Sequence, residues 1–239
     1  MRLARDDCGS GLPVLLVHGF PTSRRLWKDV VPALAAAGFR AIAPDLAGYG
    51  ESPDAGDVGM ESQARWLLEM LDELGLAQVS VVAHDVGTAA AQILAVREPK
   101  RVRRLVLIDG VHETEWAMSG VSSIVGWDPA QAARLQPVLA RKLRAIRELL
   151  EPYAGETGGN RLIHAARCLE PRQTAGMTAR LRATGIPVQV IWGAEDAWLP
   201  LETIGRPLAA ELGTGVKVLP GGHFLPFENP SAVARELIE

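Results

Sequence analysis

Val79-Ser80-Val81-Val82-Ala83-His84-Asp85-Val86-Gly87 is the stretch of sequence from which the expected fold follows. Its first five residues form a mostly apolar run, which is typical of a parallel strand covered by helices on both sides. A helical pattern over residues 86–96 begins directly after Asp85. Ala83 and Gly87 are small enough for the strand and helix backbones to approach closely. The pattern therefore predicts a sharp turn that projects Asp85 into a cavity, at the positive end of a helix.

Further apolar runs alternate with helical patterns along the whole chain. The runs cover residues 13–17, 39–43, 104–108, 187–192 and 216–219. Between residues 60 and 74, apolar side chains recur on one helical face, and Gly75 is placed to end that helix. This alternation predicts an α/β protein with a mainly parallel sheet flanked by helices.

The alternation is interrupted once, after residue 110. No convincing strand returns before Pro187, and the residues between show helical patterns, the clearest over 129–150. We therefore expect a core domain formed by residues 1–110 and 186–239. Residues 111–185 are expected to form a short helical lid, or cap, over the carboxyl edge of the sheet.

Composition excludes several classes of protein. The 239 residues are 48% hydrophobic and 22% charged, and 25 Lys and Arg against 28 Asp and Glu give a net charge of −3. This is neither a disordered chain nor the basic surface of a nucleic-acid-binding protein. Cys8 and Cys168 form no metal motif, and no apolar stretch is long enough to span a bilayer. We expect a soluble cytoplasmic protein that acts on a small molecule. No metal is expected and no cofactor, because Gly48-Tyr49-Gly50 lacks the third glycine of a dinucleotide site.

Ligands of open parallel sheets bind beyond the carboxyl ends of the strands, so the residues there are the candidate site residues. Besides Asp85, they are His18-Gly19-Phe20-Pro21, Trp192-Gly193-Ala194-Glu195-Asp196 and Gly221-Gly222-His223-Phe224. Asp85 and Asp196 are also compatible with helix caps, and Glu195 is a rival acid. His18 and His84 are interpreted as structural, because side chains alternate in direction at strand ends.

Taken in order, these segments resemble the α/β-hydrolase family, within it the branch with an aspartate nucleophile, as in epoxide hydrolases and haloalkane or haloacetate dehalogenases. The likeness covers about the whole chain. It rests on an HGxP-like turn at 18–21, a DxxGxGxS-like turn at 45–52, an elbow at 84–87, and acid and base segments at 192–196 and 222–224. The implied α/β-hydrolase fold would carry its lid after the sixth-strand position. Only 17 residues precede His18. This short segment leaves open the absence of one or both of the antiparallel edge strands that are common in this fold. An uncovered sheet edge would favour a homodimer.

The resemblance implies a role for each of these residues. Asp85 would attack carbon as a carboxylate, which needs no base because it is ionised at neutral pH. His223, oriented by Asp196, would activate the water that cleaves the resulting ester. The backbone N–H groups of Phe20 and Val86 would form the oxyanion hole.

The group that stabilises the leaving atom distinguishes the branches of the family. Epoxide hydrolases use two lid tyrosines, and Tyr153 is the one tyrosine of the expected lid. Haloalkane dehalogenases hold the halide with tryptophan N–H groups, one of them directly after the nucleophile, where this chain has Val86. Trp116 and Trp127 are lid tryptophans that would offer N–H groups to a substrate, although packing is the commoner role of such residues.

The preferred hypothesis is a hydrolase that opens a small epoxide or related electrophile through a covalent Asp85 ester. Three alternatives stay open. They are a dehalogenase of a small haloalkane or haloacid, a non-catalytic binding protein that kept the fold, and an esterase, lactonase or lyase in which Asp85 is not the nucleophile.

Overall fold

The computed structural model of the chain describes residues 1–116, 118–126, 128 and 148–239. Its centre is a seven-stranded sheet in the order β1-β3-β2-β4-β5-β6-β7. In chain order the strands are β1 (Arg5–Cys8), β2 (Leu12–Val17), β3 (Phe39–Pro44), β4 (Val79–Asp85), β5 (Val102–Gly110), β6 (Val188–Gly193) and β7 (Val216–Leu219). Neighbouring strands are parallel, except β1 and β3, which are antiparallel.

The predicted fold class is confirmed, and each of the predicted strands is present within two residues of its expected bounds. The sequence pattern missed β1, whose residues Arg-Asp-Asp-Cys show no apolar run. This strand forms by pairing with residues 41–44 of β3. The pairing is supported by an ion pair in which Arg40 binds the carboxylate of Asp7 at 2.7 and 2.8 Å. One antiparallel edge strand is therefore present.

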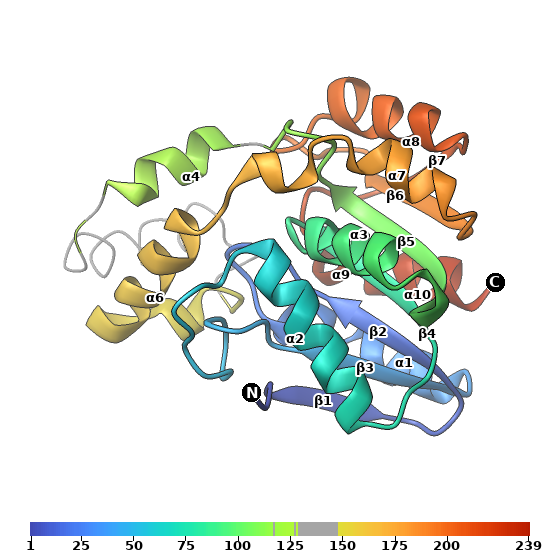
Figure 1. The fold of residues 1–239 in the computed structure, drawn as a ribbon, viewed down its shortest axis with the longest axis horizontal. Helices are drawn as coiled ribbons and strands as arrows, with labels where there is room; N and C mark the ends of the chain where they lie inside the picture. Colours follow the sequence, from blue (N-terminus) through green and yellow to red (C-terminus); the bar gives the residue numbers. More distant parts are fainter. Residues whose placement is uncertain (117, 127, 129–147) are drawn as a thin grey trace.

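Helices cover the sheet in two groups. The helices outside the β5–β6 connection are α1 (Val30–Ala36), α2 (Met60–Glu73), α3 (Gly87–Arg97), α8 (Arg206–Leu212), α9 (Leu225–Glu228) and α10 (Pro230–Ile238), with short turns η1 (Arg24–Trp27), η2 (Pro99–Arg101) and η6 (Leu201–Gly205). Helix α1 contacts α10, whereas α2, α3, α7 (Met177–Ala183) and α8 contact one another in succession. Figure 1 shows α2 and α3 in front of the sheet. Gly75 has a left-handed φ of 66° just after α2, as expected of a residue that ends a helix.

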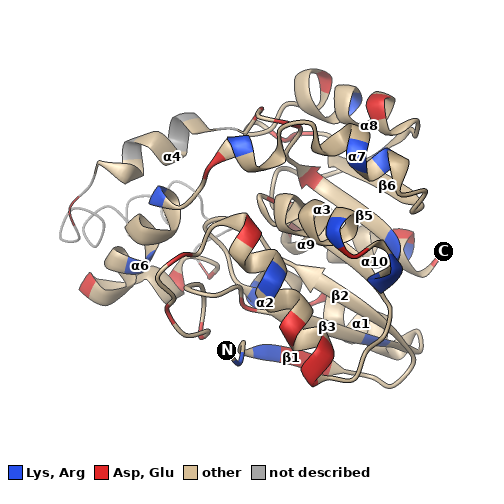
Figure 2. Ribbon diagram, in the orientation of Figure 1, with Lys and Arg blue, Asp and Glu red and all other residues tan. Residues whose placement is uncertain are grey.

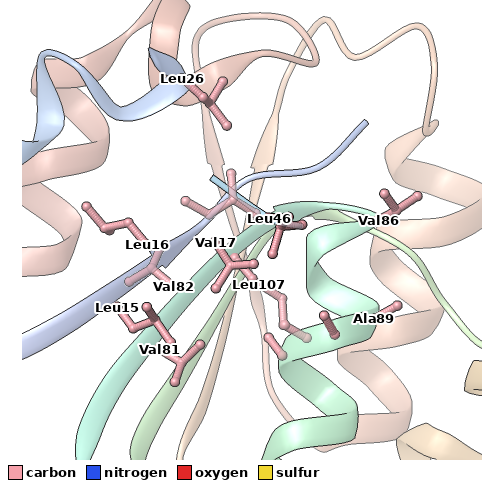
Figure 3. Close-up of a cluster of buried hydrophobic side chains, with 14 of the residues drawn as sticks. Leu15, Leu16, Val17, Leu26, Leu46, Val81, Val82, Val86, Ala89 and Leu107 are labelled. Carbon is pink, nitrogen blue, oxygen red and sulfur yellow. The ribbon is translucent and has the colours of Figure 1, made fainter. Parts of the chain in front are cut away.

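The core surrounds the central strands on both faces of the sheet and includes α3. Leu15, Leu16, Val81, Val82 and Leu107 are fully buried side chains of β2, β4 and β5 (Figure 3). Helix α3 is apolar around almost its whole circumference, because it lies between the sheet and its neighbours α2 and α7. The N-terminus of α3, which follows Asp85, is consequently held in a fixed place.

The connection between β5 and β6 contains α4 (Met118–Val125), η4 (Glu151–Tyr153), α6 (Gly155–Arg167), η5 (Pro171–Thr174) and α7 (Met177–Ala183). Figure 1 places α4 and α6 on the side of the molecule toward which the arrows of β2 and β5 point. The helix predicted over 129–150 lies outside the described residues, apart from its last three positions. The division into a core domain and a lid stays a prediction.

Acidic and basic side chains are interspersed over the described helices and strands (Figure 2). Within the described part of the chain, no helix combines the length and the apolar character needed to cross a membrane.

Candidate active site

Asp85 stands at the turn between β4 and α3. Its φ of 54° lies in the left-handed region, which costs a residue with a side chain about 1–3 kcal/mol. The glycines that surround this turn have no space for a side chain. A Cβ atom on Gly87 would overlap the carbonyl oxygen of His18, and one on Gly19 would overlap the Asp85 carboxylate. The hydroxyl of Thr88 donates to the carbonyl oxygen of Asp85 at 2.6 Å and fixes the turn.

We expect Gly87→Ala to destabilise the fold by about 2–3 kcal/mol, because the added methyl group forces β2 and α3 apart. Thermal unfolding would measure this loss as a fall in Tm of about 2–4 °C for each kcal/mol. Gly56→Ala is the matched control, since a Cβ at that position meets no atom within 4 Å. Equal Tm values for the two variants would mean that the turn tolerates a side chain at position 87.

Loops after β7 and β6 bring His223 and Asp196 to Asp85. Nε2 of His223 lies 3.4 Å from Oδ2 of Asp85, and Nδ1 lies 2.9 Å from Oδ2 of Asp196. The other oxygen of Asp196 accepts hydrogen bonds from two backbone N–H groups at 2.8 and 2.9 Å, which hold this carboxylate in place. The structure therefore places Asp196, and not the exposed Glu195, against the imidazole ring.

The two carboxylates and the imidazole change one another's protonation. Burial opposes the charged form of His223, but its hydrogen bonds to Asp196 and Asp85 outweigh burial and raise the pKa of His223 to about 10. Burial also favours the neutral form of Asp85, and here His223 outweighs it and holds the pKa of Asp85 below its usual value. At neutral pH the site is therefore an imidazolium between two carboxylates.

The two residues predicted to form an oxyanion hole direct their backbone N–H groups at this same carboxylate. The N–H of Phe20 donates to Oδ1 of Asp85 at 2.8 Å, and the N–H of Val86 also hydrogen-bonds the Asp85 carboxylate. The loop carrying Phe20 is fixed because the N–H and hydroxyl of Thr22 donate to the carbonyl oxygen of Gly19 at 3.0 and 2.9 Å. Oδ1 of Asp85 thus accepts from the N–H of Phe20, while Oδ2 faces His223.

His18 and His84 are fully buried. Nε2 of His18 accepts a hydrogen bond from the N–H of Leu46 at 2.9 Å, which joins the turns at 18–21 and 45–52. Nε2 of His84 lies 2.6 Å from the carbonyl oxygen of His223, and the two rings are 4.9 Å apart. Burial and the charge of His223 lower the pKa of His84 to about 4, so His84 is neutral and its Nε2–H donates to the carbonyl. These contacts position the loops of the site.

Two residues near His223 were not predicted from the sequence. Asp109, at the end of β5, is fully buried, with a φ of 43° and one oxygen accepting from the N–H of Gly193 at 2.7 Å. Burial and the charge of Asp196 raise its pKa well above the usual value and so favour the neutral carboxyl group. The sequence feature that could have identified Asp109 is its position at the carboxyl end of a parallel strand, the same feature that identified Asp85.

The other missed residue is Trp198. Its ring is nearly parallel to that of His223, at 6.1 Å between centroids and 25° between planes. Trp198 is 43% exposed, an unusual fraction for so large an apolar side chain beside buried ionisable groups. The sequence feature that could have pointed to Trp198 is its position two residues after Asp196.

The structure describes two of the three predicted substrate-binding residues. Tyr153 is buried, and its hydroxyl lies 3.5 Å from the carbonyl oxygen of Thr22. The indole N–H of Trp116 points at protein acceptors, the hydroxyl of Thr174 at 2.9 Å and the carbonyl oxygen of Glu113 at 3.1 Å. This N–H is already bound within the protein, and a role for Trp116 in substrate binding stays a prediction. Trp127 lies outside the described residues.

Besides Tyr153, the chain has one other tyrosine, Tyr49. The ring of Tyr49 contacts the ring of His18 edge-to-face, at 5.3 Å between centroids. Its buried hydroxyl has no hydrogen-bond partner among the described residues. Tyr49 interacts electrostatically with both Tyr153 and Asp85. Burial raises the pKa of each tyrosine, so both hydroxyls are protonated donors at neutral pH.

The chain is similar to known proteins in sequence and in structure. The chain is 30% identical to haloalkane dehalogenase 2 of Mycobacterium bovis, over all of this chain and 91% of that protein. It is 38% identical to bifunctional epoxide hydrolase 2 of Sus scrofa, over 46% of this chain and 20% of that protein. A thermophilic esterase from Thermogutta terrifontis has a similar structure, with a TM-score of 0.81, 28% identity and coverage of 98% of this chain and 91% of that one.

The family comparison covers more than half of the chain. The alpha/beta hydrolase fold family matches residues 13–145, which include the turn carrying Phe20 and the elbow carrying Asp85. The chain therefore belongs to the α/β-hydrolase family.

Proposed function

We propose that this protein is a hydrolase that opens small epoxides, or related electrophiles, through a covalent ester on Asp85. The observation that carries the proposal is the carboxylate at the elbow, with Oδ1 bound by the N–H of Phe20 and Oδ2 facing His223. A serine in this position would need a base to remove its proton. A carboxylate with a low pKa attacks carbon without one.

In the first step, Oδ2 of Asp85 forms a bond to a ring carbon, and the bond from that carbon to the epoxide oxygen breaks. The oxygen leaves as an alkoxide and takes a proton from a tyrosine hydroxyl. Oδ1 stays as the carbonyl oxygen of the new ester, within reach of the N–H groups of Phe20 and Val86.

In the second step, water attacks the carbonyl carbon of the ester. His223 takes a proton from this water, and the N–H groups of Phe20 and Val86 stabilise the negative charge on Oδ1. The bond between the carbonyl carbon and the alkyl oxygen then breaks, and His223 returns the proton to the departing diol. The carboxylic acid that this leaves on Asp85, with one oxygen taken from water, passes its proton to His223, which regenerates the carboxylate and the imidazolium of the free enzyme.

The charges of the site explain how His223 changes from cation to base. In the free enzyme its pKa is about 10, because both Asp196 and Asp85 stabilise the imidazolium. Formation of the ester removes the charge of Asp85, so the pKa of His223 falls. The proton that His223 then loses replaces the one given up by the tyrosine. The base therefore becomes available when there is an ester to hydrolyse.

The tyrosines favour an epoxide as the substrate. An alkoxide leaving group needs a proton, and Tyr49 interacts with Asp85 and carries a buried, protonated hydroxyl that has no hydrogen-bond partner among the described residues. A halide needs N–H donors instead, and the N–H of Trp116 is already bound to Thr174. The likeness to an epoxide hydrolase of Sus scrofa adds support to this choice.

A dehalogenase is the second candidate. Its support is the likeness of the whole chain to a haloalkane dehalogenase of Mycobacterium bovis. The chemistry at Asp85 would be the same, with a halide leaving in the first step without a proton. Release of halide from haloalkanes or haloacids, against formation of a diol from epoxides, separates the two candidates.

The covalent step is tested with labelled water. In a single turnover with enzyme in excess, performed in H₂¹⁸O, we expect an unlabelled diol and one ¹⁸O atom in the peptide that contains Asp85. Direct attack of water on the substrate would place the label in the diol and leave the peptide unlabelled, and this result would refute the ester. A panel of epoxides, haloacids and aryl esters that all remain unchanged would favour a non-catalytic binding protein.

A further inference from the structure

A second group of polar side chains lies where the chain leaves β5, outside the group formed by Asp85, His223 and Asp196. We propose that His112, Glu113 and Glu211 form a binding site for one divalent transition-metal cation, for which Zn²⁺ is the probe. His112 and Glu113 lie two and three residues after the end of β5, and Glu211 belongs to α8. The site does not depend on the chemistry proposed for Asp85.

The donor atoms already converge. One ligand atom from each of the three residues lies within 4.8 Å of the other two. Nε2 of His112 and Oε2 of Glu211 are 3.1 Å apart. Two ligands bound to Zn²⁺ at about 2.0–2.1 Å in a tetrahedral arrangement lie about 3.3 Å from each other. The nitrogen and oxygen are therefore at the separation of two atoms that share a cation.

The buried nitrogen of His112 is an independent indication of a ligand. His112 is 7% exposed, and its Nε2 has no hydrogen-bond partner among the described residues. The contact with Oε2 of Glu211 at 3.1 Å is an ion-pair contact and does not count as a hydrogen bond. A buried polar nitrogen without a partner is costly, and a cation bound to its lone pair would remove that cost.

The two carboxylates differ in a way that suits such a site. Glu113 is fixed, because its oxygens accept hydrogen bonds from the N–H groups of Gly176 and Thr178 at the start of α7. Backbone donors of this kind orient a ligating carboxylate. The side chain of Glu211 is 54% exposed and is free to close on a cation. Within the described part of the chain, its carboxylate has no basic partner besides His112.

The chemistry of the donors selects the class of cation. With His112 neutral, the two carboxylates give the group a charge of −2, which a divalent cation balances. One imidazole nitrogen and two carboxylate oxygens suit Zn²⁺ or Mn²⁺, whereas Ca²⁺ prefers oxygen ligands alone. A bound cation would link the start of the β5–β6 connection to α8 and, through Glu113, to α7. It would therefore stabilise the fold by mass action.

Isothermal titration calorimetry of the full chain, first treated with a chelator, tests the site. We expect one equivalent of Zn²⁺ to bind and to raise Tm, with Ca²⁺ in the same range of concentration giving neither effect. Glu211→Gln keeps the shape of an exposed side chain and is expected to weaken Zn²⁺ binding about 10-fold or more. Glu202→Gln, which removes an exposed carboxylate bound to Arg206, is the matched control and should bind Zn²⁺ as the parent chain does.

His223→Gln should also retain the Zn²⁺ site, because His223 belongs to the other group of residues. If Zn²⁺ fails to bind, or binds equally well to the parent chain and to Glu211→Gln, then His112 and Glu211 form an ion pair only and the proposal is wrong. Loss of Zn²⁺ binding in His223→Gln with no loss in Glu211→Gln would likewise overturn it, because the cation would then be held at the active site.

Discussion

His223→Gln is expected to divide the proposed reaction in two and to stop it at the covalent ester. Attack by Asp85 on the substrate needs no base, so the ester still forms. Hydrolysis of the ester loses its general base, and we expect kcat to fall by about 10²–10⁴-fold. Intact-mass spectrometry should then show the mass of one epoxide added to the protein, and peptide mapping should place it on Asp85.

The conditions of this experiment follow from the charges of the site. Removing the imidazole removes the main cause that lowers the pKa of Asp85, and burial then raises that pKa. The reaction should therefore be run over a series of pH values extending to mildly alkaline pH, which favours the carboxylate form of Asp85. His164→Gln is the matched control, since His164 lies in α6 with Nε2 3.1 Å from the carbonyl oxygen of Ala55. An inactive His223→Gln variant that never gains mass would contradict a covalent intermediate.

The fold was largely predictable because most strands of a parallel sheet carry their signal in their own residues. Strands covered on both faces must be apolar throughout, and the runs at 79–83 and 104–108 show this directly. The edge strand β1 shows the limit of such reasoning. Its residues Arg5–Cys8 are polar, and their strand conformation comes from hydrogen bonds to β3, a partner that local sequence does not reveal.

The site residues that end or follow a strand were predictable from the sequence. The site contacts that depend on tertiary structure were not. Asp85, Asp196 and His223 each end or follow a strand of one sheet, so the parallel arrangement brings them together. The stacking of Trp198 on His223 depends on the path of the loop after β6. The binding of the Trp116 N–H by Thr174 depends on contacts between two segments of the β5–β6 connection. Local sequence patterns fix neither of these contacts.

Asp85→Asn is expected to lower kcat/KM by about 10⁴-fold or more, because the amide keeps the shape of the carboxylate but is a very poor nucleophile. The parent chain and this variant should be compared on the same epoxide, with loss of ester formation measured by intact mass. Asp109→Asn is a matched control, because burial favours the neutral form of the Asp109 carboxyl group, which an amide resembles closely. Aryl-ester hydrolysis that survives Asp85→Asn would favour the esterase alternative.

The same substitution should change the ionisation of His223, which separates loss of a nucleophile from loss of structure. In the parent chain, hydrogen bonds to Asp196 and Asp85 raise the pKa of His223 to about 10 against burial. The folded-state pKa lies above that of an unfolded histidine, about 6.5. The ionised imidazole therefore stabilises the fold fully below about pH 6.5, and this contribution is lost as pH rises through about 10.

In Asp85→Asn only Asp196 remains charged, so NMR titration of the imidazole should show a lower pKa. Urea unfolding should then show a smaller loss of stability between pH 7 and pH 10 than in the parent chain. An unchanged pKa of His223 in a folded Asp85→Asn variant would mean that the two side chains are not electrostatically coupled, and the proposed conversion of His223 from cation to base would fail with it.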